Sequence, residues 1–305
     1  MIRVSKRARW SGAAAVAAGA VLAAGPFVVP AQAAPPSGIK AKGAFLLVSG
    51  SGEALWGKGS DTKRQMASTT KVMTAAVVVS TKNVDLDRKV TVKKAYRDYV
   101  TKWGGSTADL RTGDKLSLRQ LLYGLLLPSG CDAAYALADA IGTGSSSTAR
   151  VNSFIGKMNA KADQLGMKNT EYDSFDGISK KNKNYSTPRD MAKLGKYALG
   201  SANIRAVAKS TSTKQKATNG RTYTWYNTNQ LLGSYKGVIG IKTGTGTKAG
   251  PCLIFAATRG DRSVVGAILN SSSRYPDAKK MLDWGFQQKT AKLDLRSLPE
   301  GAERD

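Results

Sequence analysis

The sequence predicts an α/β fold of the α+β type: an antiparallel sheet built from both chain ends, flanked by helices, with an inserted all-α lobe. Short β-type runs occur near the start of the chain and again in its last third, whereas helical patterns dominate the middle. A continuous sheet with a helical insertion explains this order better than two independent domains, because strands from both ends then share one core. A length of 305 residues with 41% hydrophobic content suits one large globular unit.

Residues 1–33 have the features of a secretory signal peptide. Basic residues precede an Ala/Val-rich run, and Ala31-Gln32-Ala33 fits a small-residue cleavage site. The alternative is a retained membrane anchor, which is disfavoured because the run is weakly apolar and is broken at Pro26. We therefore expect residues 34–305 to be an exported chain that folds as a single unit.

The first strands and the helix after them follow from local patterns. Residues 44–48 and 53–57 are β-type runs joined by a Gly/Ser turn, which is typical of a hairpin. Residues 66–79 then contain a long apolar run opened by Ser68 and Lys71. This pattern predicts the first turn of a buried helix.

The middle of the chain contains the predicted helical lobe. Residues 116–127 are apolar nearly all round, so we expect a buried helix there. Pro128 ends it, and a second helix follows at 132–138. Ser129 is therefore expected on a tight turn between two buried helices. An amphipathic helix is predicted at 149–165.

The chain then returns to strands. Thr187-Pro188 opens one more helix, through about residue 199, by the rule that places proline at the first helical position. Three β runs at 237–245, 252–258 and 263–269 precede a closing helix at about 276–286. The predicted sheet lobe thus covers about 34–92 and 208–305, and the helical lobe about 93–207.

The residue types present restrict the chemistry. The chain has no histidine, so Ser-His-Asp and Cys-His catalysis are excluded. Two cysteines without histidine cannot supply the roughly four nitrogen or sulfur ligands of an ordinary zinc site, and we expect neither a metal nor a cofactor. A hydrolase or transferase built here must activate its nucleophile with lysine, a carboxylate or the backbone.

A Ser-x-x-Lys pattern supplies one such nucleophile. The pattern occurs at Ser37, Ser60 and Ser68, but only Ser68 opens an apolar helix. Residues three apart lie on the same face of a helix, so the Lys71 ammonium can reach the Ser68 hydroxyl. This is the arrangement of an activated nucleophile and its base.

Two further segments suggest partners for this pair. Lys242-Thr243-Gly244 lies in a predicted strand with repeated glycines, which often mark the close approach of a ligand backbone. The structural alternative for Lys242 is an ordinary lysine at the end of a strand. For Ser129 the alternative is a helix-capping serine before Asp132.

Taken together, the three segments resemble the signatures of serine penicillin-recognising enzymes: Ser68-Thr69-Thr70-Lys71, Ser129-Gly130-Cys131 and Lys242-Thr243-Gly244. The sequence around them, at residues 121–130 and 185–187, is similar to that of the low-molecular-mass penicillin-binding proteins, the D-alanyl-D-alanine carboxypeptidases. The resemblance implies a β-lactamase/DD-peptidase-like fold. It also implies acyl transfer on peptidoglycan stem peptides ending in D-Ala-D-Ala, with β-lactams as covalent inhibitors.

The resemblance also implies a role for each residue. Ser68 would attack the substrate carbonyl, Lys71 would take its proton, and Ser129 would relay a proton to the departing D-Ala. Lys242 and Thr243 would hold the terminal carboxylate. In the same segment, Gly244 and Thr245 would contact the substrate, with the backbone N–H groups of Ser68 and Thr245 forming the oxyanion hole.

Cys131 is a departure from the family pattern, because asparagine usually stands at the third position of the second motif. A thiol forms far weaker hydrogen bonds than a carboxamide, so we expect its contact with the substrate to be weaker or differently arranged. Cys131 and Cys252 are the only cysteines and could form a disulfide in an exported protein, although nothing in the sequence places them within bonding distance. Only about sixty residues follow Lys242, so we expect the C-terminal β domain and membrane anchor of many relatives to be absent.

The charge suggests anionic surroundings. The formal net charge is +26, and four of these positive charges lie in the leader. A chain exported to the cell wall or the outer face of the cytoplasmic membrane would meet anionic wall polymers or lipid headgroups, and we expect no nucleic acid partner.

The sequence leaves two alternative functions open. One class of β-lactamase uses a dedicated glutamate to hydrolyse the acyl-enzyme, and that glutamate lies in a characteristic sequence context. The chain has four glutamates, and Glu171, followed by Tyr172-Asp173-Ser174, does not match that context. A non-catalytic basic wall-binding protein on a decayed peptidase fold is the other alternative, because Cys131 is atypical.

Overall fold

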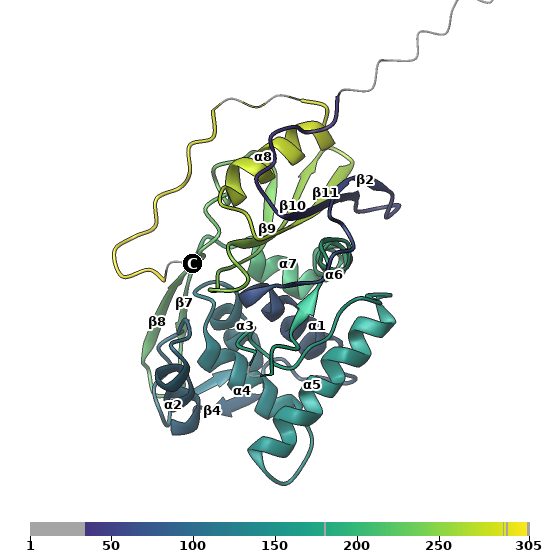
Figure 1. Ribbon diagram of the computed structural model, residues 1–305. Helices are drawn as coiled ribbons and strands as arrows, with labels where there is room; N and C mark the ends of the chain where they lie inside the picture. Colours follow the sequence, from purple (N-terminus) through teal and green to yellow (C-terminus); the bar gives the residue numbers. More distant parts are fainter. Residues whose placement is uncertain (1–33, 180, 289, 291, 304–305) are drawn as a thin grey trace, which may run out of the picture. The chain divides into compact units, whose positions relative to one another are not determined.

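The computed structural model describes residues 34–179, 181–288, 290 and 292–303, so the predicted signal peptide lies outside the described residues. A five-stranded antiparallel sheet has the strand order β2-β1-β11-β10-β9 (Figure 1). Its strands are β1 (Gly43–Val48), β2 (Ala54–Lys58), β9 (Val238–Gly244), β10 (Cys252–Arg259) and β11 (Arg262–Leu269). The sheet therefore combines strands from both ends of the described chain, as predicted.

Side chains alternate between two cores across this sheet. On β1, Leu46 faces a cluster that includes helix α8 (Arg274–Gly285), whereas Phe45 and Leu47 face the larger core beneath helix α6 (Pro188–Gly200). The two-residue period of a strand produces this division. Helices cover both faces of the sheet (Figure 1), which explains why β1 is buried along most of its length.

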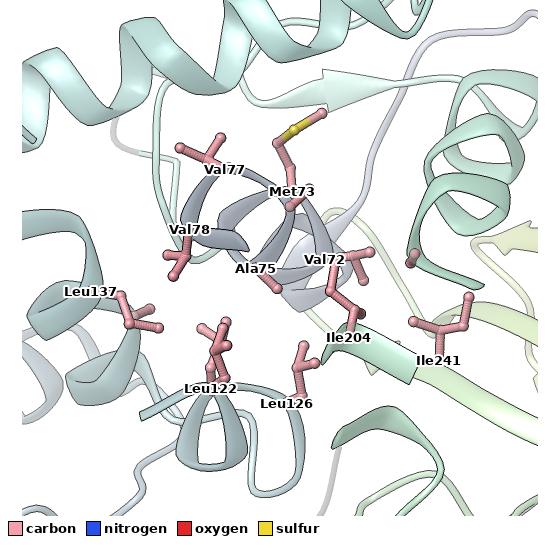
Figure 2. Packing of buried hydrophobic residues seen from close by; sticks show 14 of the residues in the cluster. Val72, Met73, Ala75, Val77, Val78, Leu122, Leu126, Leu137, Ile204 and Ile241 are labelled. Atoms are coloured by element: carbon pink, nitrogen blue, oxygen red, sulfur yellow. The ribbon is translucent and has the colours of Figure 1, made fainter. Parts of the chain in front are cut away.

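Helix α1 (Lys71–Ser80) is the centre of the larger core. Eight of its residues are buried. Figure 2 shows its apolar side chains facing neighbours from helices α3 (Leu118–Leu126), α4 (Cys131–Ile141) and α7 (Ala202–Ala208) and from β9. A helix packed on all sides is held rigidly, and the residues at its N-terminus are held with it.

The remaining helices are α2 (Lys94–Trp103) and α5 (Ser147–Gln164), and a short 3-10 helix, η1 (Ala67–Thr70), precedes α1. The start of α6 is as predicted: Thr187 is its N-cap, Pro188 occupies its first turn, and the Asp190 amide donates to Thr187 Oγ1 at 3.2 Å. Helix α2 was not predicted. Its apolar positions are few, and only Tyr96 and Val100 are buried.

Three small two-stranded sheets complete the described fold: β3 (Arg64–Gln65) with β6 (Tyr185–Ser186), β4 (Lys89–Thr91) with β5 (Lys115–Ser117), and β7 (Ser212–Lys216) with β8 (Thr222–Tyr226). The β7–β8 hairpin is separate from the main sheet. It packs towards the helical part of the molecule, where Trp225 Nε1 donates to the Ala108 carbonyl at 2.8 Å. Among the described residues, no helix is both long and apolar enough to span a membrane.

Candidate active site

Ser68 and Lys71 lie together where η1 continues into α1. Lys71 Nζ is 2.9 Å from Ser68 Oγ, which confirms the proximity predicted from the Ser-x-x-Lys spacing. Ser68 lies in the 3-10 helix rather than in the first turn of the α-helix. It is partly exposed, whereas its neighbours Ala67 and Thr69 are buried. The turn therefore presents the serine hydroxyl to the outside and keeps the lysine inside.

Three groups surround the amine of Lys71, which is fully buried. Besides Ser68 Oγ, the Asp176 backbone carbonyl lies at 3.1 Å and Cys131 Sγ at 3.4 Å. These partners come from three separate segments of the chain. They fix the end of a long side chain that would otherwise sample many rotamers.

Ser129 occupies the turn between α3 and α4, as predicted. Its φ of +64° is in the left-handed region, which is uncommon for a residue with a Cβ. Its side chain is fully buried, and among the described residues its Oγ has no hydrogen-bond partner. A strained backbone and an unsatisfied hydroxyl at one residue are typical of a functional position rather than of a structural cap.

Strand β9 brings Lys242, Thr243 and Gly244 to the serine. A Cβ on Gly244 would lie 2.8 Å from the backbone nitrogens of both Ser68 and Thr69, so only glycine allows the strand to approach this closely. Lys242 and Thr243 are buried, and the Thr243 and Thr228 hydroxyls are 2.6 Å apart. Because β9 is an edge strand of the sheet, an extended peptide could pair with it.

Arg274 is a functional candidate that the sequence reasoning missed. At the start of α8, it donates from Nη1 to Thr245 Oγ1 at 2.9 Å and to the Gly244 carbonyl at 3.3 Å. It adds a second positive charge at the end of the Lys242 segment. A lone arginine at a helix start has no motif around it, so the sequence offered no signal for it.

The loop at 173–178 is a second missed element. Its Phe175 carbonyl accepts from Thr74 Oγ1 of α1, and its Asp176 carbonyl accepts from Lys71. Gly177, with a φ of +103°, lies against the Ala67–Ser68 backbone. The only sequence signal was an Asp-Gly pair, which is typical of any turn.

Cys131 is suited to hydrogen bonding rather than to nucleophilic attack. Burial raises the pKa of its thiol well above the usual range, and the positive charge of Lys71 only partly opposes this effect. The thiol is therefore protonated at neutral pH. Both cysteines are free and buried, so the alternative of a Cys131–Cys252 disulfide is not realised in this structure. Within the described ranges, no cluster of side chains is suited to holding a metal ion.

The comparisons with known proteins identify the family of the chain. The model of a family described as D-alanyl-D-alanine carboxypeptidase, Peptidase S11, matches residues 30–273. The D-alanyl-D-alanine carboxypeptidase of Streptomyces sp. strain K15 is 50% identical over 289 residues, covering 92% of this chain and 99% of the relative.

Solved structures give the same result. The Streptomyces K15 DD-transpeptidase matches with a TM-score of 0.80 at 50% identity, covering 83% of this chain and 99% of that one. A D-alanyl-D-alanine carboxypeptidase from Mycobacterium tuberculosis H37Rv matches with a TM-score of 0.76 at 29% identity, covering 88% and 99%. The predicted DD-peptidase fold is confirmed by these matches, and the chain belongs to the D-alanyl-D-alanine carboxypeptidase family of serine peptidases.

Proposed function

We propose that Ser68 is the residue that carries the acyl group in this serine-type D-Ala-D-Ala carboxypeptidase and transpeptidase, with Lys71 as its base. The observation that carries the proposal is the 2.9 Å contact between Lys71 Nζ and Ser68 Oγ, in a chain without histidine. The substrate is the D-Ala-D-Ala end of a peptidoglycan stem peptide.

The reaction begins at the carbonyl of the penultimate D-Ala. Ser68 Oγ forms a bond to this carbon while its proton passes to the Lys71 amine. The backbone N–H groups of Ser68 and Thr245 stabilise the oxyanion, and each such donor contributes about 3 kcal/mol to the stability of the transition state.

The bond to the terminal D-Ala nitrogen then breaks. Ser129 relays the proton held by Lys71, giving its own hydroxyl proton to the departing amine and taking up the one from Lys71. This role is supported by its buried Oγ, which has no hydrogen-bond partner among the described residues. Water as the acceptor of the acyl group gives a carboxypeptidase product, and an amine gives a transpeptidase product. A penicillin presents a comparable amide and carboxylate and acylates the same serine.

The terminal carboxylate of the substrate binds at the β9 end of the site. Lys242 supplies the charge and Thr243 a hydroxyl, and Arg274 contributes a second positive charge through its position on Gly244 and Thr245. Charge-assisted hydrogen bonds of this kind orient the scissile bond as well as bind the substrate. Cys131, whose sulfur contacts Lys71 Nζ, is the last residue that we expect to touch the substrate.

A β-lactamase is not favoured by any contact in the site. The Glu171 carboxylate accepts a hydrogen bond from the Tyr185 hydroxyl at 2.8 Å. It is therefore engaged by a neighbouring strand, and none of its contacts with the described residues places it beside Ser68.

The test is release of D-Ala from a peptide ending in D-Ala-D-Ala, with and without an amine acceptor. The wild type should release D-Ala, and Ser68→Ala should not. Ser60→Ala is the matched control, because Ser60 also opens a Ser-x-x-Lys pattern and should keep full activity. Activity that survives in Ser68→Ala would contradict the proposal.

The charge and the predicted leader support a location outside the cytoplasm. Of the formal charge of +26, +22 remains once the predicted leader is removed, so we also propose that the chain binds anionic wall polymers after export. N-terminal sequencing of the exported protein should give a mature end near Ala34. Binding to isolated wall polymer should weaken steeply as salt rises, and salt-independent binding would contradict the electrostatic explanation.

A further inference from the structure

Asp176 contacts Lys71 through its backbone carbonyl, and its side-chain carboxylate has no role in the mechanism proposed above. The side chain is completely buried. Its Oδ1 accepts a hydrogen bond from the Ile178 amide at 2.9 Å, whereas Oδ2 has no hydrogen-bond partner within the described part of the chain. A buried, unsatisfied carboxylate oxygen is costly, and in a folded protein it requires an explanation.

The charge of this carboxylate acts on two protonated groups, the Tyr99 hydroxyl of α2 and the Cys131 thiol of α4. Burial raises the pKa of each, and the negative charge of Asp176 raises both further. Both groups therefore keep their protons. Cys131 Sγ and the Asp176 carbonyl oxygen lie 3.4 Å and 3.1 Å from the same Lys71 amine, which places the thiol next to the loop that carries the unsatisfied carboxylate.

The hydrogen bonds of Lys71 depend on which way that thiol points. A neutral amine, which a general base must be, has two N–H donors and one lone pair. The Asp176 carbonyl and Cys131 Sγ can accept the two N–H groups, leaving the lone pair for the Ser68 hydroxyl. A thiol can also donate, and if Cys131 donated to Lys71 it would compete with Ser68 for the lone pair.

We propose that Asp176 is a positioning residue that accepts the Cys131 S–H, so that the sulfur serves Lys71 as an acceptor and the lysine lone pair is directed at Ser68. This inference rests on the proposed roles of Ser68 and Lys71. It also explains how cysteine can stand where the motif usually has asparagine. An amide oxygen is an acceptor by itself, whereas a thiol needs a second acceptor to set its direction.

A double-mutant cycle tests whether Asp176 acts through Cys131. The rate of acylation by a labelled penicillin is measured for wild type, Asp176→Asn, Cys131→Asn and the double variant. Asparagine keeps an oxygen but not the charge, and a neutral amide oxygen accepts the S–H more weakly than a carboxylate. Asp176→Asn should therefore lower the rate about tenfold in the wild-type background and less than twofold in the Cys131→Asn background. With a D-Ala-D-Ala peptide the loss should fall on kcat and leave KM unchanged, because Asp176 does not touch the substrate.

Two variants control for structural effects. Asp173→Asn removes a carboxylate charge from the same loop, where it accepts from Ser179 Oγ at 2.6 Å and the Lys183 amide at 3.1 Å. It should acylate like wild type. Asp176→Glu keeps a carboxylate as the acceptor and should acylate faster than Asp176→Asn. An equal loss in both cysteine backgrounds, or no loss at all, would overturn the proposal.

The thiol can also be observed directly, without activity. In a Cys252→Ala background, Cys131 carries the sole S–H group, and its infrared stretching band reports how strongly it donates. Asp176→Asn should move the band to higher frequency, and an unmoved band would overturn the proposal. If wild type is not acylated at all, the proposed function fails, while this band still tests the Asp176–Cys131 contact.

Discussion

Replacement of Gly177 by alanine should damage both stability and catalysis. The residue has a φ of +103°, and an added Cβ would lie 2.2 Å from the Ala67 carbonyl oxygen and 3.0 Å from the Ser68 nitrogen. These are backbone atoms of a turn packed between α1 and β9, so they cannot move aside cheaply. The loop must instead retreat from the serine.

The size of the effect follows from two costs. The unfavourable φ costs about 1–3 kcal/mol, and overpacking against backbone costs about as much again. A total near 3 kcal/mol corresponds to a fall in Tm of roughly 6–12 °C for a domain of this size. Acylation of the folded protein should slow by roughly tenfold to a hundredfold, because the Ser68 amide proposed for the oxyanion hole is displaced.

Thermal unfolding followed by circular dichroism and acylation by a labelled penicillin measure the two effects. Gly156→Ala in α5 is the matched control, since its Cβ would meet nothing within 4 Å. It should stabilise the protein by about 0.5–1 kcal/mol and leave acylation unchanged. If Gly177→Ala melted and acylated like wild type, the loop could not lie against Ser68 as described.

Three further predictions concern single side chains. Ser129→Ala should slow D-Ala release roughly a hundredfold, yet leave Tm unchanged because no hydrogen bond among the described residues is lost; a large drop in Tm would show that the hydroxyl is structural. Arg274→Ala removes the charge held at Thr245 and should raise KM for the peptide roughly tenfold, and an unchanged KM would exclude it from carboxylate binding. Burial alone would raise the pKa of Asp139, but its hydrogen bonds, first that from Arg150, outweigh burial and hold it well below the usual range. Asp139→Asn should therefore lower the free energy of unfolding in urea by about 2 kcal/mol between pH 5 and 7. The difference between wild type and variant should shrink below about pH 4, the pKa of the unfolded state, because protonation of the wild-type carboxyl removes its stabilising contacts. A difference that does not depend on pH would refute this explanation.

The parts of the fold with strong local patterns could be predicted from the sequence. The apolar runs that became α1 and α3 and the β runs of the last third are buried on most sides, so their composition carried the signal. Helix α2 was missed because only Tyr96 and Val100 of its residues are buried. The β7–β8 hairpin was missed because β7 consists of polar residues, none of them fully buried, and the hairpin is held by contacts such as that of Trp225 with Ala108. Such tertiary contacts leave no periodic pattern.

The site divides in the same way. Ser68 and Lys71 were predicted because they lie one helical turn apart. Ser129 and Lys242 were predicted because their motifs can be recognised in the sequence. Asp176 acts through a backbone carbonyl and a buried carboxylate in a loop, and Arg274 through a contact across the molecule. Neither relation is encoded by spacing along the chain.

The Cys131 thiol illustrates a limit of reading residue types alone. The sequence showed that a weak hydrogen-bonding group replaces the usual amide, but not what surrounds it. The thiol lies beside Lys71 and is affected by the charge of Asp176, so it can accept a hydrogen bond from the lysine while donating to the carboxylate, as proposed above.

The central claim is that a penicillin acylates Ser68 and no other residue. The most direct measurement is mass spectrometry of the protein after reaction with benzylpenicillin, followed by digestion to locate the adduct. We predict one adduct per chain, on the peptide that contains Ser68, and no adduct in Ser68→Ala. An adduct on another residue, or one that persists in Ser68→Ala, would contradict the account.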